Sequence, residues 1–154
     1  MVDPVESVRG EVLRKIVESG AFPLEAVQRE NGNPPSVMPY CRLSMAQGAE
    51  WVFTTQQLCE KTVIAEVDIY TSSVGGNTQT AGKLASTIEE EFGLFSRDAS
   101  DRTIPLPGWS GVTAEVTQIG RSSTSVEADR AIYSLPLLLY IRITMEAGAK
   151  YSEL

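Results

Sequence analysis

The chain has no histidine among its 154 residues. Histidine is the commonest general base in enzymes and the commonest metal ligand, and a Ser-His or Cys-His nucleophile pair cannot form without it. Most hydrolase mechanisms are therefore excluded. Cysteine is scarce, with Cys41 and Cys59 only, and the first residues lack the basic start and apolar core of a signal peptide. We therefore expect reduced thiols in a cytoplasmic protein.

Basic residues and long apolar runs are also scarce. Thirteen Lys and Arg residues against 20 Asp and Glu residues give a formal net charge of −7. This charge disfavours tight, sequence-independent DNA binding, because such binding requires a surface that neutralises phosphates. The longest apolar run, residues 135–141, is far shorter than the roughly 20 residues of a membrane-spanning helix. We expect a soluble protein without membrane contact.

The remaining composition is that of an ordinary globular protein, with 42% hydrophobic and 21% charged residues. A chain of this length buries about 68–70% of the surface that its unfolded form exposes. No internal repeat or linker-like segment divides it. We therefore predict a single domain over residues 1–154.

Two stretches have helical periodicity. In residues 4–19 apolar side chains recur every three or four positions, with Asp3 as the N-cap and Pro4 at the first helical position. A second helix is predicted from Thr78 to about Phe95, with its apolar stripe ending at that phenylalanine. Glu89–Glu91 fall opposite this stripe, and we interpret the triplet as a solvated helix face.

Five stretches have the alternation of β-strands. They are residues 39–45, 49–54, 63–71, 111–119 and 131–145, the last followed by a short polar tail. Short connections favour antiparallel pairing. The predicted fold class is α+β, a two-layer sandwich in which two helices pack on one face of an antiparallel four- or five-stranded sheet.

Few residues have the spacing of a chemical site. Glu66 and Asp68 lie on one face of a predicted strand and could pair for metal or acid–base work, but no third oxygen ligand is near. Polar residues on a solvated sheet face are the competing interpretation. The stretch from Gly76 to Lys83 is placed like a P-loop, but its glycine spacing is one residue too long. We predict no catalytic residue, no cofactor and no metal.

Several short motifs follow one another over nearly the whole chain. They are residues 27–31 (VQREN), Pro34-Pro35, residues 39–43 (PYCRL), residues 67–70 (VDIY), Gly75-Gly76, the helix over 81–92 and residues 133–137 (YSLPL). In this order they resemble the motifs of tail terminator and tail-completion proteins of tailed bacteriophages.

The resemblance implies a structural virion protein without enzymatic activity. Its copies close into a ring, typically a hexamer, on the last ring of the tail tube, stop tube growth and offer a surface for head–tail joining. The implied partners are further copies, the tail tube protein and a head-completion or neck protein, while DNA passes through the lumen without specific binding. The implied location is the head-proximal end of the virion tail, reached after assembly in the host cytoplasm.

A closed ring requires a patch that meets a different patch on the neighbouring copy. We expect such contacts on exposed strand edges and on the segments 72–77, 96–111 and 121–130. Trp51 and Trp109 are candidate aromatic anchors, with packing over the edge of the core as the alternative. The full set of candidate interface residues is Trp51, Phe53, Val74, Gly75, Gly76, Asn77, Arg102, Trp109, Arg121 and Arg130.

Three other functions stay open at this point. A head–tail connector or neck protein shares the same assembly logic. A small metal-dependent enzyme would use Glu66, Asp68 or Glu89–Glu91. A small-ligand-binding domain would need a concave apolar pocket, which the sequence does not reveal.

Overall fold

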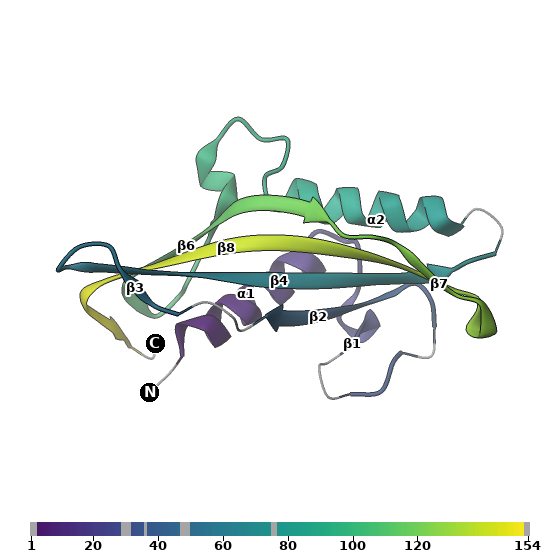
Figure 1. Ribbon diagram of the computed structural model, residues 1–154, viewed down its shortest axis with the longest axis horizontal. Coiled ribbons are helices and arrows are strands. Elements are labelled where there is room, and N and C mark those ends of the chain that lie inside the picture. The colour runs from purple at the N-terminus through teal and green to yellow at the C-terminus, as the bar shows by residue number, and fades with distance from the viewer. Residues whose placement is uncertain (1–2, 29–31, 36, 47–49, 75–76, 153–154) are drawn as a thin grey trace.

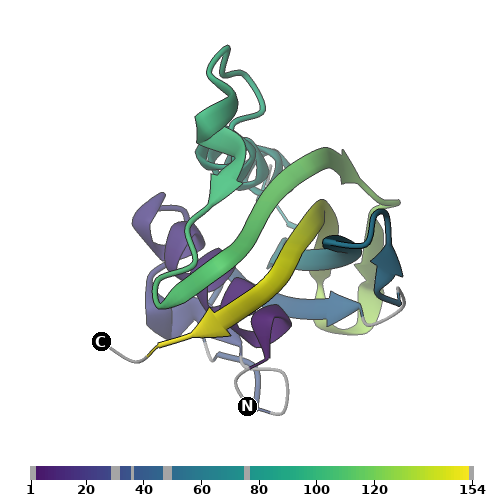
Figure 2. The ribbon, with the colours of Figure 1, turned by 90° about the vertical axis from the view of Figure 1, so that its left-hand side faces the viewer.

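The computed structural model describes residues 3–28, 32–35, 37–46, 50–74 and 77–152, except for the side chains of residues 77 and 78. Two helices cover one face of a twisted, mainly antiparallel sheet (Figure 1; Figure 2). The predicted α+β class is confirmed. The predicted strand number is wrong, because the described residues alone form a sheet of eight strands. The three extra strands have only two or three residues each, too few to show alternation.

The sheet has the strand order β1-β2-β4-β8-β6-β5, with β3 also paired to β4 and β7 to β8. β1 runs parallel to β2, and the other pairs are antiparallel. The strands are β1 (Val27–Gln28), β2 (Tyr40–Ala46), β3 (Val52–Phe53), β4 (Leu58–Ser72), β5 (Thr103–Ile104), β6 (Trp109–Arg121), β7 (Ser125–Glu127) and β8 (Ile132–Tyr151). Three short 3₁₀ helices are η1 (Leu24–Ala26), η2 (Ala99–Arg102) and η3 (Ala128–Arg130).

Helix α1 (Pro4–Glu18) forms as its sequence predicts. The carboxylate of Asp3 accepts a hydrogen bond from the backbone N–H of Val5 at 2.9 Å, which satisfies one of the free donors of the first turn. The backbone turns away from the helix at Gly20, whose φ of +81° suits glycine. One stripe of the helix, Val5, Val8, Val12 and Ile16, is buried.

Helix α2 (Asn77–Glu91) ends four residues before the predicted boundary. Gly93 has a φ of +86°, and its N–H bonds to the carbonyl of Glu90, which closes the helix. The chain then leaves the core, so Phe95 is 74% exposed instead of continuing the apolar stripe. No helix in the described ranges combines the length and the apolar character that a membrane span requires.

One continuous core lies between the helices and the sheet. Alternate residues of the two central strands point into it, from Val63 to Ile69 on β4 and from Leu135 to Ile143 on β8. The buried stripes of α1 and α2 belong to the same cluster. The predicted alternation of these two strands is confirmed.

Two strands depart from the predicted pattern. In β6 the register shifts between Val116 and Gln118, so Gln118 is exposed and Ile119 packs against the core, whereas an unbroken alternation after Val112, Ala114 and Val116 would bury Gln118. In β8 the predicted polar tail continues the strand to Tyr151, which pairs with Trp109. Backbone pairing with β6 extends the strand where the side-chain pattern no longer indicates one.

Candidate assembly surfaces

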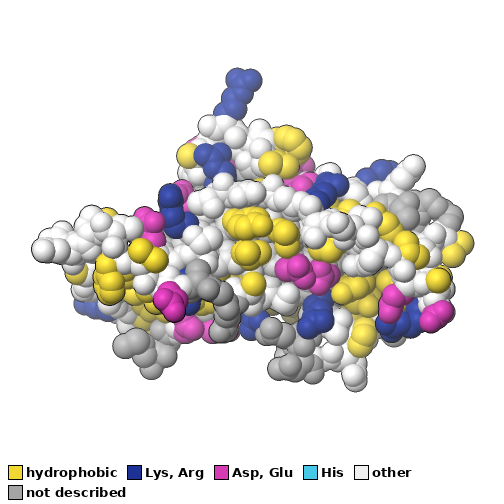
Figure 3. Space-filling view, in the orientation of Figure 1, with side chains coloured by type: hydrophobic (Ala, Val, Ile, Leu, Met, Phe, Trp, Pro, Cys, Tyr) yellow, Lys and Arg dark blue, Asp and Glu magenta, His cyan; other side chains and the backbone are white. Residues whose placement is uncertain are grey.

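No helix of the described chain covers the second face of the sheet. Figure 3 looks onto this face, where hydrophobic side chains gather in the middle with acidic and basic side chains beside them. Ile64, Leu138 and Tyr140 are half-buried in this layer, on the strand positions that alternate with the core. A broad surface that mixes apolar and charged groups can contact another protein.

Glu66 and Asp68 lie side by side on the uncovered face, as predicted. Burial raises the pKa of Asp68 to about 7, with further contributions from the charge of Glu66 and a hydrogen bond between the two carboxyl groups. The Asp68 carboxyl group therefore holds a proton in part of the molecules near neutral pH. No cluster of three or more Cys, Asp or Glu residues that could hold a metal ion occurs in the described ranges.

Arg42 lies on β2 directly opposite Asp68 in the strand register. Its buried Nε has no hydrogen-bond partner, and no carboxylate of the described chain forms an ion pair with its guanidinium. Beside it the rings of Tyr40 and Tyr70 stack, with centroids 4.8 Å apart. The sequence analysis did not select Arg42. The available signal was a charged residue on the polar side of the predicted strand 39–45.

Arg42, Tyr40 and Tyr70 line a polar pocket of about 450 Å³ at one end of the sheet. Its other wall comes from β7, η3 and the start of β8. There Arg130 donates two hydrogen bonds to the carboxylate of Glu127, at 3.0 and 2.9 Å. We call this hollow the Arg42 pocket.

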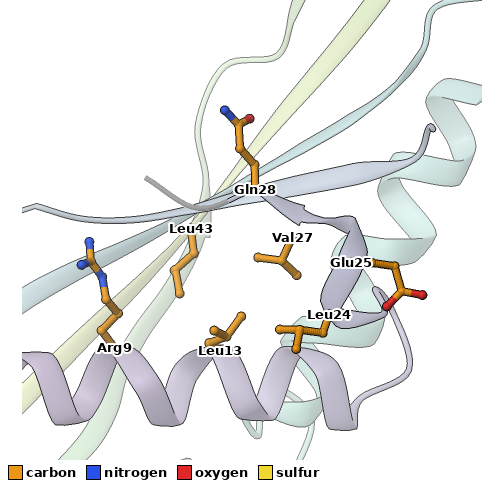
Figure 4. Close-up of a pocket in the computed structure, with 7 residues that line it drawn as sticks. All are labelled: Arg9, Leu13, Leu24, Glu25, Val27, Gln28 and Leu43. Carbon is orange, nitrogen blue, oxygen red and sulfur yellow. The ribbon is translucent and has the colours of Figure 1, made fainter. Parts of the chain in front are cut away.

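An apolar groove of about 630 Å³ runs between α1 and the β1–β2 edge of the sheet. Figure 4 shows Leu13, Leu24, Val27 and Leu43 pointing toward one another inside it, while Glu25 points away. Leu24 is 57% exposed despite its apolar side chain. A groove of this kind can receive an apolar segment of another chain.

Exposed apolar side chains also gather on projecting segments. Phe53 on β3 is 80% exposed, at the end of the sheet opposite the Arg42 pocket (Figure 1). Phe95 lies on the segment after α2 that projects beyond the sheet (Figure 2). Val74 and Val126 are exposed near the Arg42 pocket end. Single exposed apolar residues are ordinary, but bulky ones on projecting tips fit contact sites.

The candidate interface residues of the loop after β4 are only partly described. Val74 is exposed. Gly75 and Gly76 lie outside the described residues. Asn77 begins α2, and its side chain is not among those described. Arg102, at the end of η2, is half-buried.

The side chains of both tryptophans contact other residues of their own chain. The indole N–H of Trp109 donates to the hydroxyl of Ser7 at 3.0 Å, and its ring packs 5.3 Å from that of Tyr151. Trp51 is half-buried and packs against the core. These contacts fit the alternative in which the tryptophans pack over the edge of the core better than the one in which they are free to anchor an interface.

Arg121 forms an ion pair within the chain. Its Nη2 and Nε donate to the carboxylate of Glu89 at 2.6 and 3.2 Å, which raises the pKa of Arg121. Only 8% of the Glu89 side chain is exposed, so its interpretation as part of a solvated face is wrong. A carboxylate this deeply buried requires a partner, and β6 supplies one 32 residues further along the chain.

No family model matches the chain, and no curated protein matches its sequence. It is similar in fold to a chain of the solved structure described as "Virion of native gene transfer agent (GTA) particle", with a TM-score of 0.59. The match covers 94% of this chain and 99% of that chain at 10% sequence identity. At this identity the likeness shows a shared fold over nearly the full length of both chains.

Proposed function

We propose that this protein is a structural component of a phage-like virion, and that its copies form a ring that caps the tail tube. The ring, a hexamer by the family resemblance, ends tube polymerisation and provides the attachment surface for the head-completion complex. The observation that carries this proposal is the fold likeness to a chain of a virion, which leaves almost no part of either chain unmatched.

The surface of the chain supports a role in assembly. Closing a ring requires two different patches per copy, and capping a tube and joining a head require further contacts. The chain offers an apolar groove beside α1, the exposed Phe53 tip, the projecting segment with Phe95, and the Arg42 pocket. These four features lie on different parts of the molecule, so several partners can be engaged together.

The proposal requires no catalytic step and no cofactor. The partners are further copies, the tail tube protein and a head-completion or neck protein, and the net charge of −7 suits a conduit through which DNA passes without adhering. The virion tail is the final location, and the host cytoplasm is the place of assembly. A head–tail connector or neck protein is the second candidate, because the same fold likeness supports it equally.

Electron microscopy of the purified protein mixed with tail tubes tests the proposal. We expect rings at one end of each tube and an arrest of tube elongation. Deleting the gene separates the two candidates, since loss of a terminator gives tails of uncontrolled length and loss of a connector gives normal tails with unjoined heads. Calorimetry with Mg²⁺, Mn²⁺ and Zn²⁺ tests the alternative of a metal-dependent enzyme. Stoichiometric binding of one of these ions would favour that alternative.

A further inference from the structure

The guanidinium of Arg42 lacks some of the hydrogen-bond acceptors that a buried cation normally has. Its Nε–H is buried without an acceptor, and the described chain offers it no ion pair. A buried N–H that lacks a partner destabilises the fold, most of all when the group carries a charge. Such a group is normally matched by an acceptor, and the part of the chain that the structure describes does not provide one.

Two acidic groups of the described residues near this pocket form no ion pair with Arg42. Asp68 faces Arg42 across the strand pair, and the positive charge of Arg42 partly offsets the rise in the pKa of Asp68, but the Asp68 carboxyl group is hydrogen-bonded to Glu66. Glu127, on the far wall of the pocket, already accepts two hydrogen bonds from Arg130. Arg42 is therefore a cation of this pocket with which no carboxylate of the described residues forms an ion pair.

The pocket suits one chemical class of ligand. A guanidinium presents several N–H donors in one plane, which matches the two oxygens of a carboxylate. The stacked rings of Tyr40 and Tyr70 form an apolar wall beside it, which strengthens a charged hydrogen bond by excluding water. The hydroxyls of Ser125 and Ser134 add neutral donors around the same hollow.

We propose that the Arg42 pocket binds a carboxylate group, and that a neighbouring copy of this chain supplies it in the assembled ring. This inference rests on the proposed ring. Each copy carries 20 acidic against 13 basic residues, so a neighbour packed against the pocket presents mainly carboxylates. Ring closure also requires this patch to meet a different patch, which a single copy cannot bring to its own pocket.

The first experiment measures ring formation by mass photometry over a range of protein concentrations. The variants are Arg42→Gln, which removes the charge, and Arg42→Lys, which keeps the charge but not the planar donors. We expect Arg42→Gln to raise the concentration at which half the copies are assembled by roughly 10- to 100-fold, and Arg42→Lys to raise it less. Arg14→Gln is the matched control, because the exposed Arg14 pairs with Glu11 and Glu18 of its own helix, away from the pocket.

The second experiment identifies the carboxylate. The Arg42→Lys variant is mixed in ¹⁴N- and ¹⁵N-labelled forms, assembled and treated with a carbodiimide, which joins an amine to a touching carboxylate. We expect a cross-link from position 42 to an Asp or Glu peptide in mixed-isotope pairs, which only two different copies can give. A cross-link found only in single-isotope form would assign the carboxylate to the same copy and overturn the proposal.

Two further results separate this inference from the proposed function. Normal rings with Arg42→Gln would overturn the inference and leave the ring intact. A wild-type chain that neither forms rings nor caps tubes would overturn both. A short DNA duplex tests for a phosphate ligand by fluorescence anisotropy, and a loss of DNA affinity with normal ring assembly would assign the pocket to phosphate instead. Circular dichroism confirms that each variant is folded.

Discussion

The two faces of the sheet are built from the same strands but are specified in different ways. On the covered face, alternate side chains of β4 and β8 are apolar and buried under α1 and α2. On the uncovered face, the intervening positions mix apolar and charged groups, including Glu66, Asp68 and Arg42. The first pattern stabilises the fold by burial. The second includes the Nε of Arg42, which is buried without a hydrogen-bond partner among the described residues.

Adjacent leucines on β8 give the largest expected contrast between the faces. Leu137 is fully buried, whereas Leu138 lies on the uncovered face. Leu137→Ala should lower the free energy of unfolding by about 2–5 kcal/mol, because it removes packed methyl groups and leaves a cavity. Leu138→Ala should cost about 1 kcal/mol or less. Urea unfolding of both variants measures the difference, and equal losses would mean that the two faces contribute alike.

The ion pair between Glu89 on α2 and Arg121 on β6 is a polar contribution to stability on the covered side of the sheet. Arg121→Ala leaves the buried Glu89 carboxylate without its guanidinium. We expect a loss of about 1–3 kcal/mol in the free energy of unfolding, less than for a fully buried pair because Arg121 is partly exposed. Glu90→Gln, an exposed change on the same helix, is the control and should have almost no effect. Indistinguishable thermal melts of the two variants would contradict a structural role for the pair.

Asp68 predicts a pH dependence of stability. Its pKa of about 7 in the folded chain lies above the ~3.9 of an unfolded aspartate, so the folded state binds more protons between these values. The stabilisation from its protonated form is complete below about pH 4 and is lost as the pH rises to about 7. Asp68→Asn should flatten the fall in stability over this window. Chemical unfolding at several pH values checks this prediction, and an unchanged slope would contradict the raised pKa of Asp68.

Phe22 and Phe53 compare a buried and an exposed phenylalanine. We expect the change at the exposed position to have the smallest effect on stability of all these variants, apart from the control at Glu90. Phe22 is buried in the core, whereas Phe53 is almost fully exposed at the β3 tip. Phe53→Ser should change the free energy of unfolding by no more than about 0.5 kcal/mol while weakening ring assembly. Phe22→Ala is the matched comparison and should unfold the chain far more readily. Unchanged assembly of Phe53→Ser would remove this tip from the contact surfaces.

Local pattern predicted the elements of the fold well. The N-cap at Asp3, the stripe of α1 and the alternation of β4 and β8 follow from spacing within a few residues, and the structure has them as predicted. The short strands β1, β5 and β7 were missed because two or three residues carry no period. The candidate interface residues stay a prediction. Phe53 and Val74 are exposed, whereas Trp109 and Arg121 interact within their own chain.

The sequence by itself determined which residues are apolar, at what spacing, and therefore which face of each long element enters the core. Only the tertiary structure decided which polar groups meet. It joins Arg121 to Glu89, places Arg42 opposite Asp68, and shifts the register of β6 after Val116. The physical reason is range, because burial periodicity is local along the chain, whereas a hydrogen bond between distant residues depends on how the strands and helices pack.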